Sequence, residues 1–377
     1  PTESPILKIW LPPQFDPQSG TTAGDILAAR INQFEIDNPG IQVDVRVKST
    51  NGAASLIDSL STASAAAPDV LPDLVALPRS DMETGALKGL LIPLDGLTTM
   101  LKEEDWYAYA RQLATIQGST FGVPFAGDAL VLLYRPSLAG QQNSDWQSVL
   151  SQHSACAFPA ADYEALLTLA LYQASGGSIQ DDQNRPMLQE KPLETALKIY
   201  ATGIQNGVFP LWLAQYETDG QSWQAYQDKR AQLVITWMSR YLTELPPDTM
   251  ALPLPPMGDT PLTLATGWVW SIPKSGSEPN PLSIKLMEYL TAGNFLGTWN
   301  AAAGLMPTRA SALSGWKTPT LTNLLGQVVL SAQAIPQNDL LVTLGPVLRD
   351  ATLEMFKGSA DPVQVAQAAI ERLTRLQ

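Results

Sequence analysis

The sequence contains only one cysteine and one histidine in 377 residues, and this scarcity excludes several kinds of site. Cys156 has no partner for an internal disulfide, and His153 with Cys156 supplies too few ligands for a zinc site. A Ser-His-Asp triad would have to use His153, yet the sequence has no Gly-x-Ser-x-Gly turn to carry the nucleophile. Phosphate-binding glycine motifs are also missing. We therefore expect neither a metal nor a cofactor.

Basic residues are also few: 36 acidic residues outnumber 23 basic ones, which gives a formal charge of −13. Such a surface repels phosphate backbones and anionic lipid headgroups, so no nucleic-acid partner is expected. The sequence also lacks an apolar run near the ~20 residues that a membrane helix needs. These features predict a soluble protein.

What is present is a chain long enough for two domains, with alternating strand and helix patterns. Segments 6–11 and 74–77 are short apolar strands, and segment 41–47 alternates apolar with polar residues. Helical spacing follows each of the first two strands, and a further helix is expected from Ser80 to Leu87. The order βαβαβ predicts an α/β fold with a parallel sheet.

Ligands of such sheets bind beyond the carboxyl ends of the strands. The loops after the three strands begin at Trp10, at Asn51 and at Ser80 with Asp81, so these residues are candidates for ligand binding. Each also has a structural explanation. Trp10 could cap the core, Asn51 precedes a glycine in a favourable turn, and Ser80 or Asp81 could cap a helix.

Two tryptophans alternate with other residues in the segment 264–272. Trp268 and Trp270 are two residues apart, so their indoles leave the same face if the segment is a strand. An ordinary hydrophobic core would explain that pattern as well. Pro273 ends the strand, and a helix from about Pro281 to Thr291 follows, with Gly293 expected to close it.

The same region carries a resemblance to a known family. Segment 267–274 reads Gly-Trp-Val-Trp-Ser-Ile-Pro-Lys, and segment 304–309 reads Gly-Leu-Met-Pro-Thr-Arg. Together they resemble the closing signature of family 1 extracellular solute-binding proteins, the maltose-binding-protein-like receptors of ABC importers. Segments 72–97, 118–136 and 221–242 are similar to further passages of this family, in the same order, so the resemblance covers nearly the whole chain.

The resemblance implies a two-lobed periplasmic-binding-protein fold with a central ligand cleft and three interlobe crossings, near 124–130, 262–267 and 306–311. One discontinuous lobe would comprise 1–127 and 266–308, and the other 128–265 and 309–377.

The resemblance also extends the set of candidate ligand-binding residues. Asp128 matches the family's cleft carboxylate, and Trp237 matches the tryptophan that the second lobe supplies. Trp268 matches the ligand platform, with Trp270 as a second contact or as its buried support. Arg309 is the last residue of segment 304–309, which resembles the family's closing signature, and it is the basic residue among the candidates for ligand binding.

The implied function is that of an extracytoplasmic receptor, periplasmic or lipid-anchored to the outer face of the cytoplasmic membrane. It would bind a di- or oligosaccharide, close around it as a monomer, and deliver it to the membrane permease of an ABC importer without acting as an enzyme. Indoles beside carboxylates suit sugars, but they also suit a cationic non-sugar ligand. A glycoside hydrolase remains an alternative, with Asp81 and Asp128 as its carboxylate pair. So does a receptor domain that signals through a membrane sensor.

Overall fold

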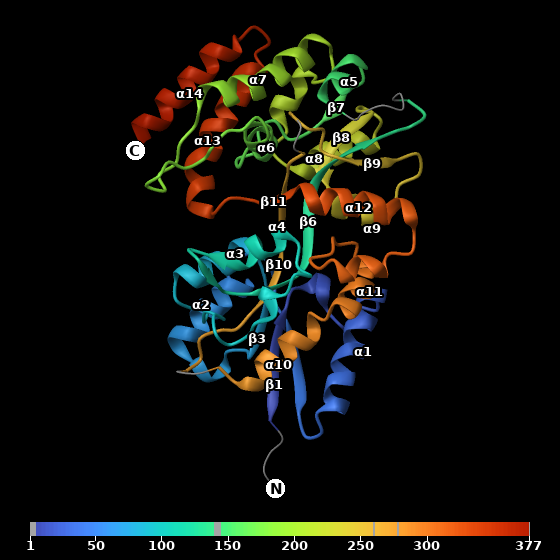
Figure 1. Cartoon of the computed structure of the whole chain (residues 1–377), viewed down its shortest axis with the longest axis vertical. Helices are drawn as coiled ribbons and strands as arrows, with labels where there is room; N and C mark the ends of the chain where they lie inside the picture. The colour runs from blue at the N-terminus through green and yellow to red at the C-terminus, as the bar shows by residue number, and fades with distance from the viewer. Residues whose placement is uncertain (1–4, 139–144, 259–260, 277–278, 377) are drawn as a thin grey trace. The chain divides into compact units, whose positions relative to one another are not determined.

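The computed structural model describes residues 5–138, 145–258, 261–276 and 279–376 (Figure 1). The chain divides into two compact units, each built from two chain segments. Unit 1 comprises Pro1–Asp128 and Ala265–Leu330, and unit 2 comprises Ala129–Leu264 and Ser331–Gln377. No helix among the described residues is long and apolar enough to cross a bilayer.

The sheet of unit 1 has the strand order β2-β1-β3-β10-β6. Strand β1 pairs in parallel with β2 and with β3, which confirms the predicted parallel βαβαβ arrangement. Strand β10 runs antiparallel to β3, with Trp268 opposite Pro78. The strands of this sheet are β1 (Ile6–Leu11), β2 (Gln42–Val47), β3 (Leu74–Pro78), the first half of β6 (Val123–Tyr134) and most of β10 (Thr263–Ser271). Strands β4 (Thr115–Ile116) and β5 (Ser119–Thr120) pair with each other in a separate two-stranded sheet.

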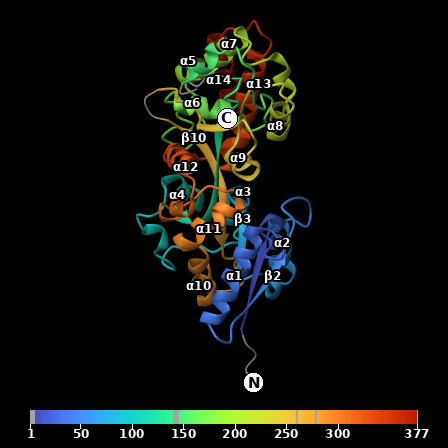
Figure 2. The ribbon, with the colours of Figure 1, turned by 90° about the vertical axis from the view of Figure 1, so that its right-hand side faces the viewer.

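Helices cover both faces of this sheet because each presents an apolar stripe. Helix α1 buries Leu27, Ile31 and Phe34 at helical spacing, and the Thr21 hydroxyl caps its first turn by accepting the backbone N–H of Gly24. Helix α1 lies against α10 and α11 (Figure 2). The helices of unit 1 are η1 (Pro13–Phe15), α1 (Thr22–Asp37), α2 (Leu56–Ala66), η2 (Pro68–Val70), α3 (Arg79–Leu87), η3 (Met100–Lys102), α4 (Ala108–Ala114), α10 (Pro281–Leu290), α11 (Gly293–Ala303), η5 (Ser311–Gly315) and α12 (Pro319–Ser331).

An aromatic cluster fills the core on one face of the unit 1 sheet. Phe15 meets Phe125, Trp268 and Trp299 edge to face, with ring centroids 5.0–5.4 Å apart. Phe125 in turn stacks on Trp270 at 4.9 Å. Trp268 and Trp270 therefore both contact this cluster, as expected of two indoles that leave one face of β10.

Unit 2 combines a mixed sheet with a layer of helices. The second half of β6 pairs antiparallel with β8 and with β9, and β7 pairs in parallel with β8. Strand β11 adds to β10. The elements are α5 (Trp146–Ser151), β7 (Cys156–Ala157), α6 (Leu166–Ala174), α7 (Glu190–Gln205), η4 (Leu211–Gln215), α8 (Asp219–Gln227), β8 (Leu233–Trp237), α9 (Met238–Glu244), β9 (Met250–Pro253), β11 (Ala332–Ala334), α13 (Asn338–Met355) and α14 (Pro362–Leu376).

The helical layer of unit 2 joins distant parts of the sequence. Figure 1 shows α7, α13 and α14 side by side, and these helices contact one another. Within this layer the buried Thr168 hydroxyl bonds to the hydroxyls of Tyr200 and Thr352 at 2.8 and 2.6 Å. Buried hydroxyls that bond to one another avoid the cost of unpaired polar groups, so the C-terminal helices are held to α6 and α7.

The third predicted lobe boundary is wrong. The first two breaks lie next to the predicted ones, but residues 309–330 belong to unit 1 and not to the second lobe. Two contacts hold them there. Arg309 is paired with Glu103 and Asp105, and Gly315 packs so closely on the backbone of Gly297 that a Cβ atom would lie 2.2 Å from it.

The predicted role of Gly293 is also wrong. Helix α10 ends at Leu290 with Thr291 as its C-cap, and Gly293 opens α11. A side chain at this position would collide with the Ser311 hydroxyl, 1.9 Å from an ideal Cβ atom, so glycine is needed here for close packing rather than for a turn.

Candidate functional site

In unit 1, most of the predicted site residues lie at one edge of the sheet. Strands β1, β2 and β3 are parallel, so their carboxyl ends lead toward Trp10, Asn51, Ser80 and Asp81 at the same edge. Trp268 pairs with Pro78 at the end of β3. An ideal Cβ atom on Gly267 would lie 3.3 Å from the Cα atom of Gly127, which brings the neighbouring Asp128 toward the same edge.

The aromatic and polar residues at this edge of the sheet differ in how exposed their side chains are to solvent. Trp10 is only 4% exposed, and the ammonium of Lys48 lies 4.3 Å from the centre of its ring. Asn51 and Ser80 are exposed. Trp268 is half-buried, whereas Trp270 is 3% exposed. Trp10 and Trp270 are therefore core residues, while Trp268 retains accessible surface.

Asp81 is electrostatically unusual. Burial raises the pKa of its carboxyl to about 6, and the nearby Asp58 carboxylate adds to the effect. It lies in the first turn of α3, where the helix dipole favours negative charge. A carboxylate that is costly to ionise and lies at the edge of the sheet is typical of a functional position.

We expect the pKa of Asp81 to produce a measurable pH dependence of stability. The folded chain holds this proton between about pH 4 and 6, whereas the unfolded chain has already lost it. The free energy of unfolding should thus fall as the pH rises through this window. Asp81→Asn should remove that fall and stabilise the protein at neutral pH by about 1–3 kcal/mol. Urea unfolding at acidic and neutral pH measures both effects.

The exposed Asp182 provides the matched control. Asp182→Asn should leave the pH profile of unfolding unchanged. An Asp81→Asn profile that follows the wild type would show that Asp81 ionises as an ordinary surface carboxyl.

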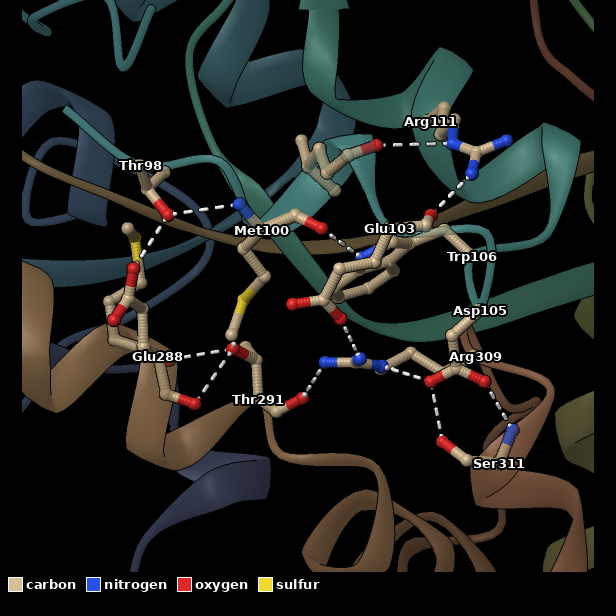
Figure 3. Close-up of polar contacts among 12 residues, drawn as sticks. Thr98, Met100, Glu103, Asp105, Trp106, Arg111, Glu288, Thr291, Arg309 and Ser311 are labelled. Carbon is tan, nitrogen blue, oxygen red and sulfur yellow. Dashed lines mark hydrogen bonds and ion pairs between the residues drawn. The ribbon is translucent and has the colours of Figure 1, made fainter. Parts of the chain in front are cut away.

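Arg309 lies inside an ion-pair network of its own (Figure 3). The residue is 8% exposed, and its Nε donates to Asp105 Oδ2 at 2.6 Å. The other guanidinium nitrogens donate to the Glu103 carboxylate and to the Thr291 carbonyl, the latter at 3.1 Å. Trp106 covers the guanidinium, with its ring centre 4.6 Å away.

The Asp105 carboxylate of this network also has several hydrogen-bond partners in the protein. Burial alone would raise the pKa of Asp105, but hydrogen bonds from Ser311 and Arg309 outweigh it and lower the pKa. Ser311 donates both its backbone N–H and its hydroxyl to Asp105, at 2.7 and 2.6 Å. The network ties residues 309–311 to the segment before α4. The use of Arg309 as a ligand contact remains a prediction, but all of these donors already have protein partners.

We expect Arg309→Met to destabilise the protein by about 2–3 kcal/mol. Breaking a buried ion pair typically costs more, but the Glu103 and Asp105 side chains are partly exposed and regain water. Chemical unfolding gives the stability, and calorimetry of the folded variant with the ligand gives the affinity. A loss of affinity with unchanged stability would contradict the structural role.

In unit 2, Trp237 forms part of the wall of a pocket of about 230 Å³. It is the last residue of β8, is half-buried and pairs with Leu130 of β6. The apolar wall is Leu130, Phe158, Pro159, Leu166, Leu167 and Ile235. The polar wall is Thr218 with four carboxylates, Asp162, Glu164, Glu217 and Asp219.

The four carboxylates come from two short segments at the starts of α6 and α8. Asp162 accepts the backbone N–H of Leu166 at 3.0 Å at the start of α6. Asp219 starts α8 and accepts the guanidinium Nε of Arg240 at 3.1 Å. Burial raises the pKa of Asp162 and that of Glu164, and the Asp162 carboxylate raises the latter further.

The sequence interpretation missed these four residues. The available signal was the pair of triplets 162–164 and 217–219, each with two acids separated by one residue and each at or just before the start of a helix. By itself that pattern is typical of helix capping. Only the packing of α8 on β8 brings the second triplet to the Trp237 wall.

The hydrolase alternative depends on Asp81 and Asp128 acting as a pair. The neighbour that raises the pKa of Asp81 besides burial is Asp58, and the charge of Asp128 acts on the buried Tyr109. Burial, followed by Tyr107 and Asp128, raises the pKa of the Tyr109 hydroxyl well above its usual value. Each carboxylate thus has a different electrostatic neighbour.

Comparison with known proteins identifies the family. The model of the bacterial extracellular solute-binding protein family matches residues 29–323, most of the chain. The chain belongs to this family. None of the curated protein sequences compared with the chain matches it.

Solved structures show the same fold for this solute-binding protein. The sugar-binding protein MalE of Xanthomonas citri superposes with a TM-score of 0.77 at 22% identity, over 98% of this chain and 97% of that one. A cyclic alpha-maltosyl-1,6-maltose binding protein of Arthrobacter globiformis gives 0.78 at 15%, over 99% of both chains. A maltodextrin-binding protein of L. casei gives 0.78 at 14%, over 99% and 98%. The predicted α/β fold of the periplasmic-binding-protein type is therefore confirmed.

Family membership places the solute-binding protein outside the cytoplasm and favours binding over catalysis. Of the predicted site residues, the structure brings Trp10, Asn51, Ser80, Asp81, Asp128 and Trp268 toward one sheet edge of unit 1. Trp270 lies in the core behind them, Arg309 lies in its own ion-pair network, and Trp237 belongs to unit 2.

Proposed function

We propose that this solute-binding protein is the receptor of an ABC importer for a carbohydrate, specifically a di- or oligosaccharide. The observation that carries the proposal is the Trp237 pocket, which sets a half-buried indole among carboxylates. The proteins of similar fold supply further support, because they are a sugar-binding, a cyclic alpha-maltosyl-1,6-maltose binding and a maltodextrin-binding protein.

The chemistry of the lining matches that of a sugar ring. Pyranose rings present apolar C–H faces, which stack on a flat indole such as Trp237. Their rims carry hydroxyl donors, which carboxylates such as Glu217 accept. A charge-assisted hydrogen bond contributes about 1.5–3 kcal/mol, and aromatic contacts add about 0.5–1.5 kcal/mol beyond area burial. Two of each provide about 4–9 kcal/mol before ordering costs, a range that reaches the roughly 8 kcal/mol of a micromolar ligand near its upper end.

We further propose that residues of both units contribute to binding. Trp268 and Asp128 are the candidates in unit 1, and Trp237 is the candidate in unit 2. A ligand that contacts both units favours the closed state by the difference in its affinity for the two states. The closed monomer then presents the sugar to the membrane permease, from the periplasm or from a lipid anchor on the outer face of the membrane.

Native mass spectrometry of the purified protein, followed by a thermal-shift screen, tests this function. A retained ligand should have the mass of a sugar, and di- to tetrasaccharides should raise the melting temperature. At a concentration of 100 Kd the stabilisation is about 2.7 kcal/mol, which raises the Tm by several degrees. Stabilisation by quaternary amines without any response to sugars would overturn the proposal. Release of shorter products from an oligosaccharide would instead indicate a hydrolase.

A further inference from the structure

The carboxylates that line the Trp237 pocket outnumber the basic side chains that pair with them. Among the described residues, Asp219 pairs with Arg240, but no hydrogen bond or ion pair engages the carboxylates of Glu164 and Glu217. Asp162 receives only backbone N–H groups, from Glu164 and Leu166 at 3.2 and 3.0 Å. Three of the four carboxylates therefore have no cationic partner there.

The cations that pack near the same segments are already engaged. Arg349 lies over the ring of Tyr163 at 5.5 Å, and Asp350 holds its guanidinium at 3.2 Å. Arg230 lies over the ring of Trp212 at 4.6 Å and donates to the Tyr216 hydroxyl at 3.1 Å. The backbone carbonyl of Tyr216 accepts the N–H of Ala161, so this cation lies beside the two acidic loops without reaching their carboxylates by any ion pair of the described residues.

A neutral sugar would make this imbalance worse. Binding displaces water from the carboxylates, and hydroxyl donors replace that water without compensating the charge. An ammonium group compensates it, and it also interacts favourably with the face of an indole. Trp237 lines the same pocket, so an indole is available there.

We propose that the carbohydrate carried by this protein bears a protonated amino group, and that the ammonium is bound in the Trp237 pocket between Glu164, Glu217 and Asp162. The inference rests on the proposed function and names the ligand class of that site. A metal ion is a poorer occupant, because no group of His, Cys, Asp and Glu among the described residues is placed to hold one. An ammonium needs no closed ligand shell and accepts the spacing of separate carboxylates.

Isothermal titration calorimetry of the full chain with matched sugars tests the inference. The probes are maltose, maltotriose and cellobiose, each with a counterpart in which glucosamine replaces one glucose, and the N-acetylated form of each counterpart. At about pH 6.5 the glucosamine nitrogen is charged and the N-acetyl nitrogen is neutral. We expect at least one glucosamine sugar to bind about tenfold or more tightly than both its hydroxyl and N-acetyl forms, which corresponds to about 1.4 kcal/mol.

Variants of the pocket assign that preference to its carboxylates. The double variant Glu164→Gln with Glu217→Gln removes two charges while keeping the shape, so the preference for the charged nitrogen should fall to about threefold or less. Glu104→Gln, at an exposed residue of unit 1 outside the pocket, is the control and should keep the full preference. Circular dichroism confirms that each variant is folded.

The outcomes separate this inference from the function on which it rests. Hydroxyl sugars that bind as tightly as their glucosamine forms would overturn the inference and leave the carbohydrate receptor intact. A preference that survives in the double variant would overturn the assignment to this pocket. Failure of every sugar to bind would overturn both proposals.

Discussion

Replacing Trp270 by alanine should destabilise the protein by about 3–5 kcal/mol, the usual cost of truncating a buried tryptophan. Trp270 is 3% exposed and stacks on Phe125 with ring centres 4.9 Å apart. Phe125 also contacts Phe15 and Trp299, so the cavity would open at the centre of the aromatic cluster. Urea unfolding followed by fluorescence measures the free-energy change.

Trp268 is the matched control for Trp270, because it lies two residues away on the same face of β10. It is half-buried and meets Phe15 only edge to face at 5.0 Å, so Trp268→Ala should cost about 1–2 kcal/mol. The sugar affinity of the Trp268→Ala variant should fall sharply. If Trp268→Ala instead unfolds the protein and Trp270→Ala abolishes binding, the assignment of core and ligand surface on this strand is reversed.

Replacing Trp237 by alanine should weaken sugar binding by about 100-fold. The indole is an aromatic part of the wall of the unit 2 pocket, and losing its stacking surface together with the aromatic contact removes roughly 3 kcal/mol of affinity. The residue is half-buried at the junction of β8 and α9, so stability should fall by only about 1–2 kcal/mol. Calorimetric titration of the folded variant gives the affinity.

Trp212 provides the comparison within the same unit. It is half-buried, contacts Tyr216 and Arg230, and does not line the pocket. Trp212→Ala should therefore keep the wild-type affinity. Equal losses in the two variants would point to a general perturbation of unit 2, and a Trp237→Ala affinity within threefold of the wild type would remove Trp237 from the site.

The unit 1 sheet was predictable because its strands follow local rules. Period-two and fully apolar segments predicted β1, β2 and β3, and helical spacing after the first two strands predicted α1 and α2. Parallel order follows from the alternation of strands and helices. The positions of Asn51, Ser80 and Asp81 after the strands then follow from topology alone.

Prediction failed where contacts between distant segments decide the outcome. Residues 309–330 belong to unit 1 because Arg309 meets Asp105 and Gly315 meets Gly297, pairings that no local pattern reveals. For the same reason Gly293 was interpreted as a helix end, although it is the absence of a side chain there that leaves space for Ser311.

By itself, then, the sequence determined the α/β class, the order of its elements, the absence of a zinc or triad motif, and the strand ends where a ligand could bind. These follow from spacing along the chain, which local sterics and apolar periodicity fix. Tertiary structure alone decided that Trp270 is core while Trp268 retains surface, that Arg309 is held by two acids, and that four carboxylates join Trp237. Burial and charge pairing depend on which distant residues come together, and that information resides in the packing rather than in the local sequence.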